Sequence, residues 1–222
     1  MTKPLHIVCL DTPWPADYGG AIDMFYRIKV LSEAGVQIHL HYFSYNQRGN
    51  PTELNQYCSS IHVYERKTGF RGFSFRLPYI VSSRINSDLA NNLNKDNHPI
   101  LIEGVHCTGI LPLLNKENRK IVVRLHNNES AYYKHLASST RNLFRKIYYR
   151  FESGLLAKYE RNLPKDIHYA CITQREENFF REEYGLTHSF FLPVFTPYHE
   201  IRCLEGMGTF CLYHGNLGVA EN

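Results

Sequence analysis

The chain has 222 residues, of which 43% are hydrophobic and 21% charged, and its formal net charge is +4. This composition is typical of a globular protein with a full core, and it excludes an intrinsically disordered chain. The small positive charge does not by itself indicate an acidic partner. No apolar run reaches the roughly 18 residues of a membrane-spanning helix, and residues 1–20 lack the pattern of a secretory signal. We therefore expect a cytoplasmic protein, with attachment to a membrane surface left open.

Disulfide and metal-binding motifs are missing from the sequence. The six cysteines show no C-x-x-C spacing, and several lie inside apolar, strand-like runs. They predict buried thiols in a reducing compartment rather than a disulfide framework or a zinc site. No D-x-D motif and no histidine–carboxylate group at ligand spacing occurs either, so we expect no metal and no cofactor.

Strand-like and helix-like segments alternate along the chain. Short apolar runs predict strands at 6–10, 36–45, 61–65, 100–103, 121–125, 169–173 and 190–194. Apolar residues at helical spacing predict helices at 21–34, 87–94, 110–115, 130–137, 140–162 and 174–184. Residues 66–84 are predicted to form a loop. Such alternation is typical of parallel β/α units, so we expect an α/β fold with a Rossmann-like parallel sheet flanked by helices.

The loop between the first predicted strand and helix ends in two glycines, in the segment Pro15-Ala-Asp-Tyr-Gly-Gly20. Because a helix N-terminus leaves backbone N–H groups unpaired, a glycine pair at this point lets an anion approach them closely. In an open α/β sheet, ligands bind beyond the carboxyl ends of the strands. The pattern favours half of a phosphate site, although an α/β domain without a ligand can use the same turn.

The last residues restart the strand-then-glycine pattern, since residues 209–216 read TFCLYHGN. A lone strand and turn cannot form a core. We therefore expect residues 1–196 to form one complete lobe, and residues 197–222 to hold a connector and the start of a truncated second lobe.

Four motifs, in their order along the chain, resemble the N-terminal half of family 4 glycosyltransferases. They are the strand–P-x-x-Y-G-G–helix turn, the segment Arg124-Leu-His-Asn-Asn-Glu-Ser130 with Tyr132-Tyr133 behind it, the long basic helix ending in Tyr159-Glu160, and the restart Tyr213-His-Gly-Asn216. The resemblance covers nearly the whole chain. It implies the GT-B architecture, in which two Rossmann-like lobes face each other across a cleft. A nucleotide-diphosphate sugar binds mainly to the C-terminal lobe, and the N-terminal lobe supplies the acceptor surface, the glycine loop and an active-site histidine.

Carried onto this sequence, the resemblance implies roles for individual residues. Gly19 and Gly20 would bind the donor phosphates, where backbone N–H groups stabilise charge on the departing oxygen. His126 would be the catalytic histidine, because it leaves the end of a central strand and its imidazole would project into the cleft. The remaining candidates are assigned to acceptor binding: Tyr18, Glu103, Arg124, Asn127 and Glu129.

Several of these candidates also have a structural interpretation. His126 could be an ordinary hydrogen-bonded histidine at a strand end. Arg124 and Asn127 could contact substrate or brace the loop. Asn128 suits a helix N-cap, and Glu129 suits the first turn that follows it.

The function that these residues predict is sugar transfer from a nucleotide-diphosphate sugar to a glycan or lipid-linked acceptor of a cell-surface polysaccharide. No pair of carboxylates stands out as an acid/base couple, which agrees with a retaining reaction. We expect the chain to fold alone but not to turn over. One departure from the family concerns the phosphate clamp, because Asn216 and Glu221 stand where many members have arginine and lysine. A nicotinamide dehydrogenase lobe is disfavoured, since G-x-G-x-x-G is absent after the first strand.

Two basic stretches bear on the partners. Residues 66–84 hold five Lys or Arg and no acid, with aromatic residues interleaved, which suits an anionic membrane or a lipid-linked acceptor. The alternative is a solvated loop whose aromatic rings fold onto the core. In the predicted helix at 140–162, apolar residues form one stripe, which predicts an ordinary packing helix: Phe144, Ile147, Phe151 and Leu155. No nucleic-acid recognition motif accompanies these charges, so we expect no nucleic-acid partner. The main alternative function is a non-catalytic module that binds an acidic glycan or an anionic membrane surface.

Overall fold

The computed structural model describes residues 3–44, 48–49, 51–198, 200 and 206–209. Seven strands form one sheet in the order β3-β2-β1-β4-β5-β6-β7, and every neighbouring pair is parallel. The strands are β1 (Lys3–Cys9), β2 (Val36–Ser44), β3 (Ser60–Glu65), β4 (Ile100–Glu103), β5 (Ile121–Leu125), β6 (His168–Cys171) and β7 (Ser189–Phe191). The predicted α/β, Rossmann-like fold is therefore confirmed.

The strands are connected by six α-helices and three 3-10 segments within the described residues. The helices are α1 (Gly19–Glu33), α2 (Tyr79–Ser82), α3 (Ser87–Leu93), α4 (Glu129–Ser139), α5 (Leu143–Arg161) and α6 (Gln174–Tyr184). The 3-10 segments are η1 (Thr52–Gln56), η2 (Gly69–Arg71) and η3 (Val105–Leu113). Two predictions need correction here. Residues 66–84 do not form a loop throughout, since they contain η2 and α2. The segment predicted as a helix at 110–115 is instead the end of η3, because Pro112 lacks the N–H that an α-helix would use.

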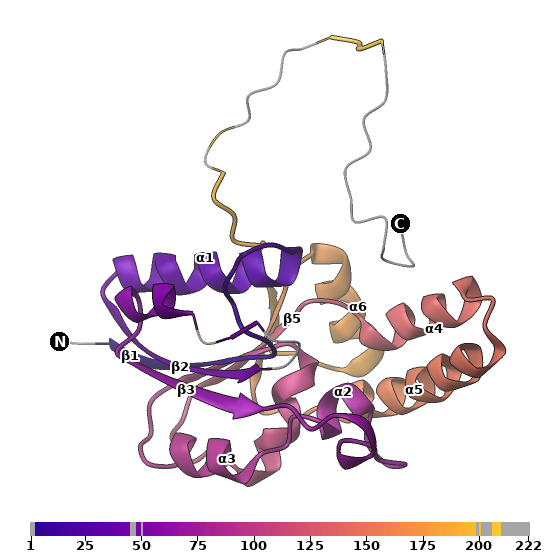
Figure 1. Ribbon diagram of the computed structural model, residues 1–222, viewed down its shortest axis with the longest axis horizontal. Helices are drawn as coiled ribbons and strands as arrows, with labels where there is room; N and C mark the ends of the chain where they lie inside the picture. Colours follow the sequence, from indigo (N-terminus) through magenta and orange to yellow (C-terminus); the bar gives the residue numbers. More distant parts are fainter. Residues whose placement is uncertain (1–2, 45–47, 50, 199, 201–205, 210–222) are drawn as a thin grey trace.

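Helices cover both faces of the sheet (Figure 1). On one face α1 buries Met24, Phe25 and Ile28 against β1 and β2. On the other face α2, α3, η3 and α5 pack, and Leu89 and Leu156 belong to its core. Because both faces are covered, the central strands carry apolar side chains on both sides, which explains the apolar runs 100–102 of β4 and 121–123 of β5.

The order of the strands creates a switch point between β1 and β4. From β1 the chain proceeds through β2 and β3 to one edge, and from β4 it proceeds through β5, β6 and β7 to the other edge. The loops that follow β1 and β4 therefore diverge, and ligands bind in the crevice that such loops leave beyond the carboxyl ends of the strands.

The long helix α5 does not pack through its apolar stripe, so the predicted packing helix is wrong in its orientation. Phe144 is 84% exposed and Ile147 is 60% exposed. The buried residues of α5 are Glu152, Leu156 and Glu160. The physical reason lies in the two carboxylates, which accept backbone N–H groups of neighbouring elements and so hold this side of the helix inward.

Two predictions concern the C-terminal part of the chain. The strand predicted at 209–216 lies outside the described residues except for Thr209, and the lobe boundary after residue 196 stays a prediction. Among the residues that the structure describes, no helix has both the length and the apolar character needed to cross a membrane.

Candidate functional site

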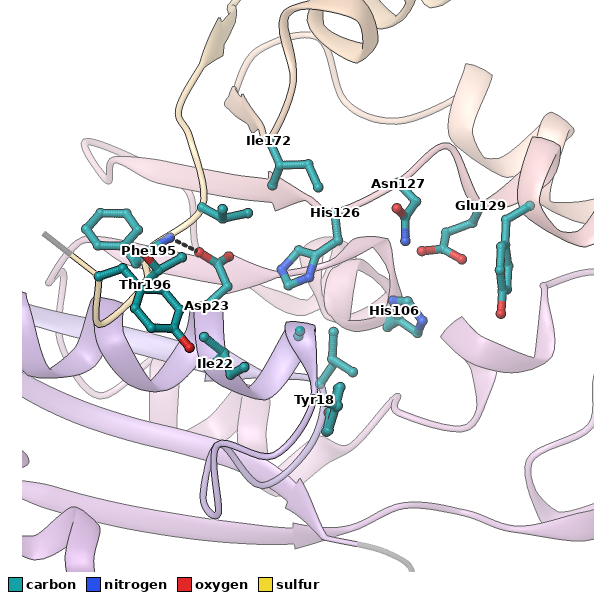
Figure 2. A pocket seen from close by; sticks show the side chains of 16 residues that line it. Tyr18, Ile22, Asp23, His106, His126, Asn127, Glu129, Ile172, Phe195 and Thr196 are labelled. Atoms are coloured by element: carbon teal, nitrogen blue, oxygen red, sulfur yellow. Dashed lines mark hydrogen bonds between the residues drawn. The ribbon is translucent and has the colours of Figure 1, made fainter. Parts of the chain in front are cut away.

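A pocket of about 650 Å³ lies at the carboxyl edge of the sheet, at the switch point (Figure 2). Five parts of the chain line it: the loop after β1 with the start of α1, His106 of η3, the loop from β5 into α4, Ile172 after β6, and the segment after β7. Figure 2 shows His126 in the middle of the pocket, between Asp23 on one side and Asn127 on the other.

Six of the predicted site residues line this pocket: Tyr18, Gly19, Gly20, His126, Asn127 and Glu129. Gly20 and His126 are 106 positions apart in the sequence, and the fold brings both to the rim of the same pocket. The other two predicted acceptor residues, Glu103 and Arg124, do not line the pocket. Both side chains are fully buried and lie beneath it.

Glu103 and Arg124 belong to a buried ion-pair network with Asp23 and Arg27 of α1. Glu103 ends β4 and is in register with Arg124 of β5, so both side chains reach the face of the sheet that α1 covers. The Arg27 guanidinium donates to Asp23 and to Glu103, each at 2.9 Å. Two carboxylates are thus matched by two guanidinium groups, which is the condition for keeping such charges buried.

Arg124 acts as a brace between three segments. Its Nε and Nη2 donate to the Asp23 carboxylate at 2.8 and 3.2 Å, and its remaining N–H groups reach the carbonyl oxygens of Leu192 and Pro193 at 2.9 and 3.0 Å. Phe195 N–H also donates to Asp23, at 2.7 Å. Arg124 therefore fastens the segment after β7 to α1, and this position supports the bracing interpretation rather than a direct substrate contact.

His126 is joined to the same network through Glu103. Its Nε2 lies 2.9 Å from Glu103 Oε2, and its side chain is 13% exposed. Burial alone would raise the pKa of Glu103, but the Arg27 guanidinium and the His126 hydrogen bond outweigh burial and hold that pKa below its ordinary value. An ionised carboxylate only accepts, so Nε2 carries the hydrogen and Nδ1 is the nitrogen left for chemistry.

Asp23, Glu103 and His126 bring one possible ligand atom each within 4.8 Å of one another, as a metal site would. However, both Asp23 oxygens and Glu103 Oε2 already accept hydrogen bonds from guanidinium groups. Burial alone would raise the pKa of Asp23, but the guanidinium groups of Arg27 and Arg124 outweigh burial and lower that pKa. Since the positive charge that these carboxylates need comes from arginine, we interpret the group as an ion-pair network, and the expectation of no metal stays a prediction.

The start of α1 lines the pocket with Gly19 and Gly20, and the first backbone N–H groups of a helix have no partner within the helix. At Gly19 an added Cβ would meet nothing within 4 Å, so this side of the helix start is open to a ligand. At Gly20 an added Cβ would lie 2.9 Å from the ring of Tyr18. That ring is held in place, since its hydroxyl donates to Asp11 at 3.1 Å and the Arg48 guanidinium lies 5.2 Å from its centroid. The arrangement suits the approach of an anion to the helix N-terminus.

The loop from β5 into α4 is fixed by a cap and a buried carboxylate. The Asn128 side chain accepts from Ala131 N–H at 2.9 Å, as predicted for an N-cap. From α5, the Glu160 carboxylate accepts the N–H groups of Glu129 and Ser130 at 2.9 and 3.3 Å. Burial raises the pKa of Glu160 to about 7, against the lowering effect of these hydrogen bonds. Asn127 and Glu129 are thereby presented to the pocket by a rigid turn.

Sequence reasoning missed four contributors to the site. His106 lines the pocket, and its buried Nδ1 has no hydrogen-bond partner among the residues that the structure describes. Burial, with Arg84 nearby, keeps the pKa of His106 well below its usual range, so the ring is neutral. Asp23 and Arg27 had one signal, a charged pair at i and i+4 inside an otherwise apolar helix face. No pattern in the sequence indicated that residues from 194 to 198 line the pocket.

The comparisons with known proteins agree with this fold. No protein-family model matches the chain. A curated protein of Klebsiella pneumoniae, described as an uncharacterized 44.6 kDa protein in cps region, is 28% identical over 226 residues, which is 97% of this chain and 56% of that protein. The chain therefore spans about half the length of the curated relative it matches.

Solved structures that are similar to the chain include the two that follow. Sucrose-phosphate synthase from Thermosynechococcus elongatus matches with a TM-score of 0.54 and 14% identity, over 86% of this chain and 48% of that one. A weaker likeness, with a TM-score of 0.46 and 10% identity, is to Phytolacca americana UGT2 complexed with UDP-2fluoro-glucose and pterostilbene, over 86% of this chain and 53% of that one. At 14% identity the first likeness shows the fold, which is the one predicted.

Proposed function

We propose that the chain is the acceptor-side lobe of a GT-B sugar transferase of the family 4 type, which uses a nucleotide-diphosphate sugar. The observation that carries the proposal is the shared pocket at the switch point, where the glycine start of α1 and the imidazole of His126 meet. The fold likeness to sucrose-phosphate synthase supports sugar transfer. The relative from a cps region supports a capsule-type polysaccharide as the product.

In the proposed reaction, an acceptor hydroxyl oxygen forms a bond to the anomeric carbon of the donor sugar. The bond from that carbon to the phosphate oxygen breaks, and the nucleoside diphosphate leaves with the electron pair. Its departing oxygen takes up the proton of the acceptor hydroxyl. Negative charge then grows on the leaving phosphate. In this proposal the N–H groups at the start of α1 stabilise this charge, and the open space beside Gly19 lets the phosphate come close.

The role that we assign to His126 follows from its bond to Glu103. The carboxylate fixes the ring orientation and favours the hydrogen on Nε2, so Nδ1 is available to accept from a sugar hydroxyl. We propose retention of the anomeric configuration, as the resemblance implies, with His126 binding a hydroxyl of the reacting sugar. The anomeric configuration of the product, measured by NMR, decides between retention and a reaction in which His126 is the general base.

The lining suits a glycan acceptor. Tyr18, Tyr132 and Phe195 are among the residues that line the pocket, and aromatic surface packs against the apolar faces of sugars. A second pocket of about 550 Å³ adjoins the first through Asn127, Tyr132 and Ile172. The two form one groove along the rim toward α6, which favours an acceptor longer than one sugar.

A turnover assay tests the proposal. Release of nucleoside diphosphate is measured with a panel of nucleotide-diphosphate sugars, for the 222-residue chain alone and for the chain joined to a second, donor-binding lobe. We expect release only where a second lobe follows. In that protein His126→Ala should lower turnover by about 100-fold or more, the scale of loss when one preorganised hydrogen-bonding group at a reaction centre is removed.

His168→Ala is the matched control, because His168 is an exposed histidine at the opposite edge of the sheet. Transfer by the 222-residue chain alone would contradict the two-lobe proposal. Equal activity of the His126 and His168 variants would remove His126 from the reaction.

A non-catalytic module that binds through residues 66–84 is the second candidate. An aromatic-lined pocket of about 650 Å³ at the switch point has no part in such a function. Tight binding of the chain to an acidic glycan, unaffected by substitutions in the pocket, is the result that would favour this candidate.

A further inference from the structure

The outer face of α5 is apolar where a surface helix is normally polar. Leu143, Phe144, Ile147 and Phe151 recur at spacings of three and four, so they lie on one side of the helix, and all four are exposed. A single exposed apolar residue is ordinary, but a row of four large ones on one helix face marks an interaction site.

This orientation is held by the opposite side of α5. The Glu152 carboxylate accepts the N–H of Tyr79 at 2.8 Å, and Ser153 Oγ donates to the carbonyl of Ser130 at 2.9 Å. Glu160, one helical turn beyond Leu156, accepts two further N–H groups. Because three polar side chains of α5 are bonded inward, the apolar row cannot turn into the core without breaking them.

A second exposed aromatic group lies beside this helix. Phe70 is 98% exposed and Phe75 is 78% exposed, so these rings do not fold onto the core. Tyr79 links the two regions, since its N–H binds Glu152 of α5 and its hydroxyl accepts from Gly69 N–H at 3.0 Å. Figure 1 shows α2, which follows this segment in the chain, next to α5.

Cations surround both apolar groups, and acids are missing. Residues 140–151 contain four Lys or Arg and no Asp or Glu, and residues 66–84 contain five and none. Two of these nine, Arg66 and Arg84, bond within the protein. The remaining seven offer positive charge around the apolar surface: Lys67, Arg71, Arg76, Arg141, Arg145, Lys146 and Arg150.

We propose that the outer face of α5 and residues 67–76, together called the α5 surface, dock on an anionic lipid membrane. Large apolar side chains enter the boundary between headgroups and acyl chains, while the surrounding cations meet lipid phosphates. Charge complementarity selects this partner, because a purely apolar partner would not need seven cations without an acid. The proposal does not depend on sugar transfer. It would place the protein at the inner face of the membrane.

Vesicle co-sedimentation of the 222-residue chain tests the docking. Phosphatidylcholine vesicles with and without phosphatidylglycerol are compared. We expect binding only to the anionic vesicles, and a loss of affinity of about tenfold or more in Arg145→Glu/Arg150→Glu, since each cation near such a surface contributes about fivefold. Phe144→Ser/Ile147→Ser should lose binding to a similar extent because its apolar anchors are removed.

Two matched controls separate docking from general surface effects. Lys3→Glu/Lys120→Glu makes the same charge change at the opposite edge of the sheet, and Val30→Ser/Leu113→Ser removes exposed apolar side chains elsewhere. Both should bind like the parent chain. All variants should keep the parent's circular dichroism and urea midpoint, because every substituted side chain is exposed or half-buried.

The proposal is overturned if the parent chain ignores the anionic lipid, or if the controls and the α5 variants bind alike. It is also overturned if the parent chain binds no vesicle but forms a dimer that Phe144→Ser/Ile147→Ser dissociates in analytical ultracentrifugation. That result would assign the α5 surface to a second copy of the chain.

Discussion

Replacing Arg124 by methionine should destabilise the fold by about 3–4 kcal/mol, the loss seen when one partner of a buried ion pair is removed. The Arg124 side chain is fully buried and supplies two of the four hydrogen bonds that the Asp23 carboxylate accepts. After the substitution, Asp23 keeps only Arg27 and the Phe195 N–H. The carbonyls of Leu192 and Pro193 lose their donors as well, but these residues are partly exposed, so water can replace the guanidinium there and the added cost is small.

Urea unfolding followed by circular dichroism measures this loss. Arg150→Met, at an exposed position, is the matched control and should change the free energy of unfolding by no more than about 0.5 kcal/mol. Amide hydrogen exchange supplies a local readout, because residues 192–195 should exchange faster once Arg124 no longer holds them. A variant within about 1 kcal/mol of the parent chain, with unchanged exchange at 192–195, would refute the bracing role of Arg124.

Two pH-dependent predictions follow from other buried groups. Burial lowers the pKa of His6 to about 4, against its attraction to Asp96, so the fold favours neutral His6 and loses stability as the pH falls below about 6.5. Urea unfolding at pH 7.5 and at pH 5 measures how much stability each protein loses on acidification. His6→Gln should lose about 2 kcal/mol less than the parent chain between these two pH values, and an equal loss would exclude this assignment. The raised pKa of Glu160, about 7, acts in the opposite direction, because stability present below pH 4.5 is lost as the pH rises through 7. The free energy of unfolding of Glu160→Gln, measured relative to that of the parent in the same way, should therefore rise by about 2 kcal/mol between pH 5 and pH 8. A difference between the two proteins that does not change with pH would contradict the burial argument.

The fold was predictable because its signals are local. The strand β5 and the helix α6 were predicted with the bounds that the structure shows, since apolar runs and helical periodicity end there at clear signals such as Gly185, which adopts φ 66° at the end of α6. Switch-point geometry then brings the loops after β1 and β5 together, so the shared rim of Gly19 and His126 followed from the sequence.

The roles of Glu103 and Arg124 were not predictable in the same way. A charged residue near a strand end resembles a substrate contact in the sequence, and only the packing of α1 shows that Asp23 and Arg27 bury both side chains. The segment after β7 reaches the pocket through contacts 172 positions apart in the chain, which no local pattern encodes.

The orientation of α5 shows how polar contacts can reverse a pattern. Periodicity marks the apolar stripe at Phe144 and Ile147 as the packing face, and transfer free energy favours burying it. The helix instead buries Glu152 and Glu160, whose carboxylates satisfy N–H groups of α2 and α4. Those bonds connect α5 to both the pocket and the α5 surface. Glu160 fixes the turn that presents Asn127 to the pocket, and the exposed stripe on the other side of the helix forms the α5 surface. A membrane that engages the α5 surface would therefore hold the pocket at a fixed distance and orientation from the lipid, which is the geometry that a lipid-linked acceptor requires.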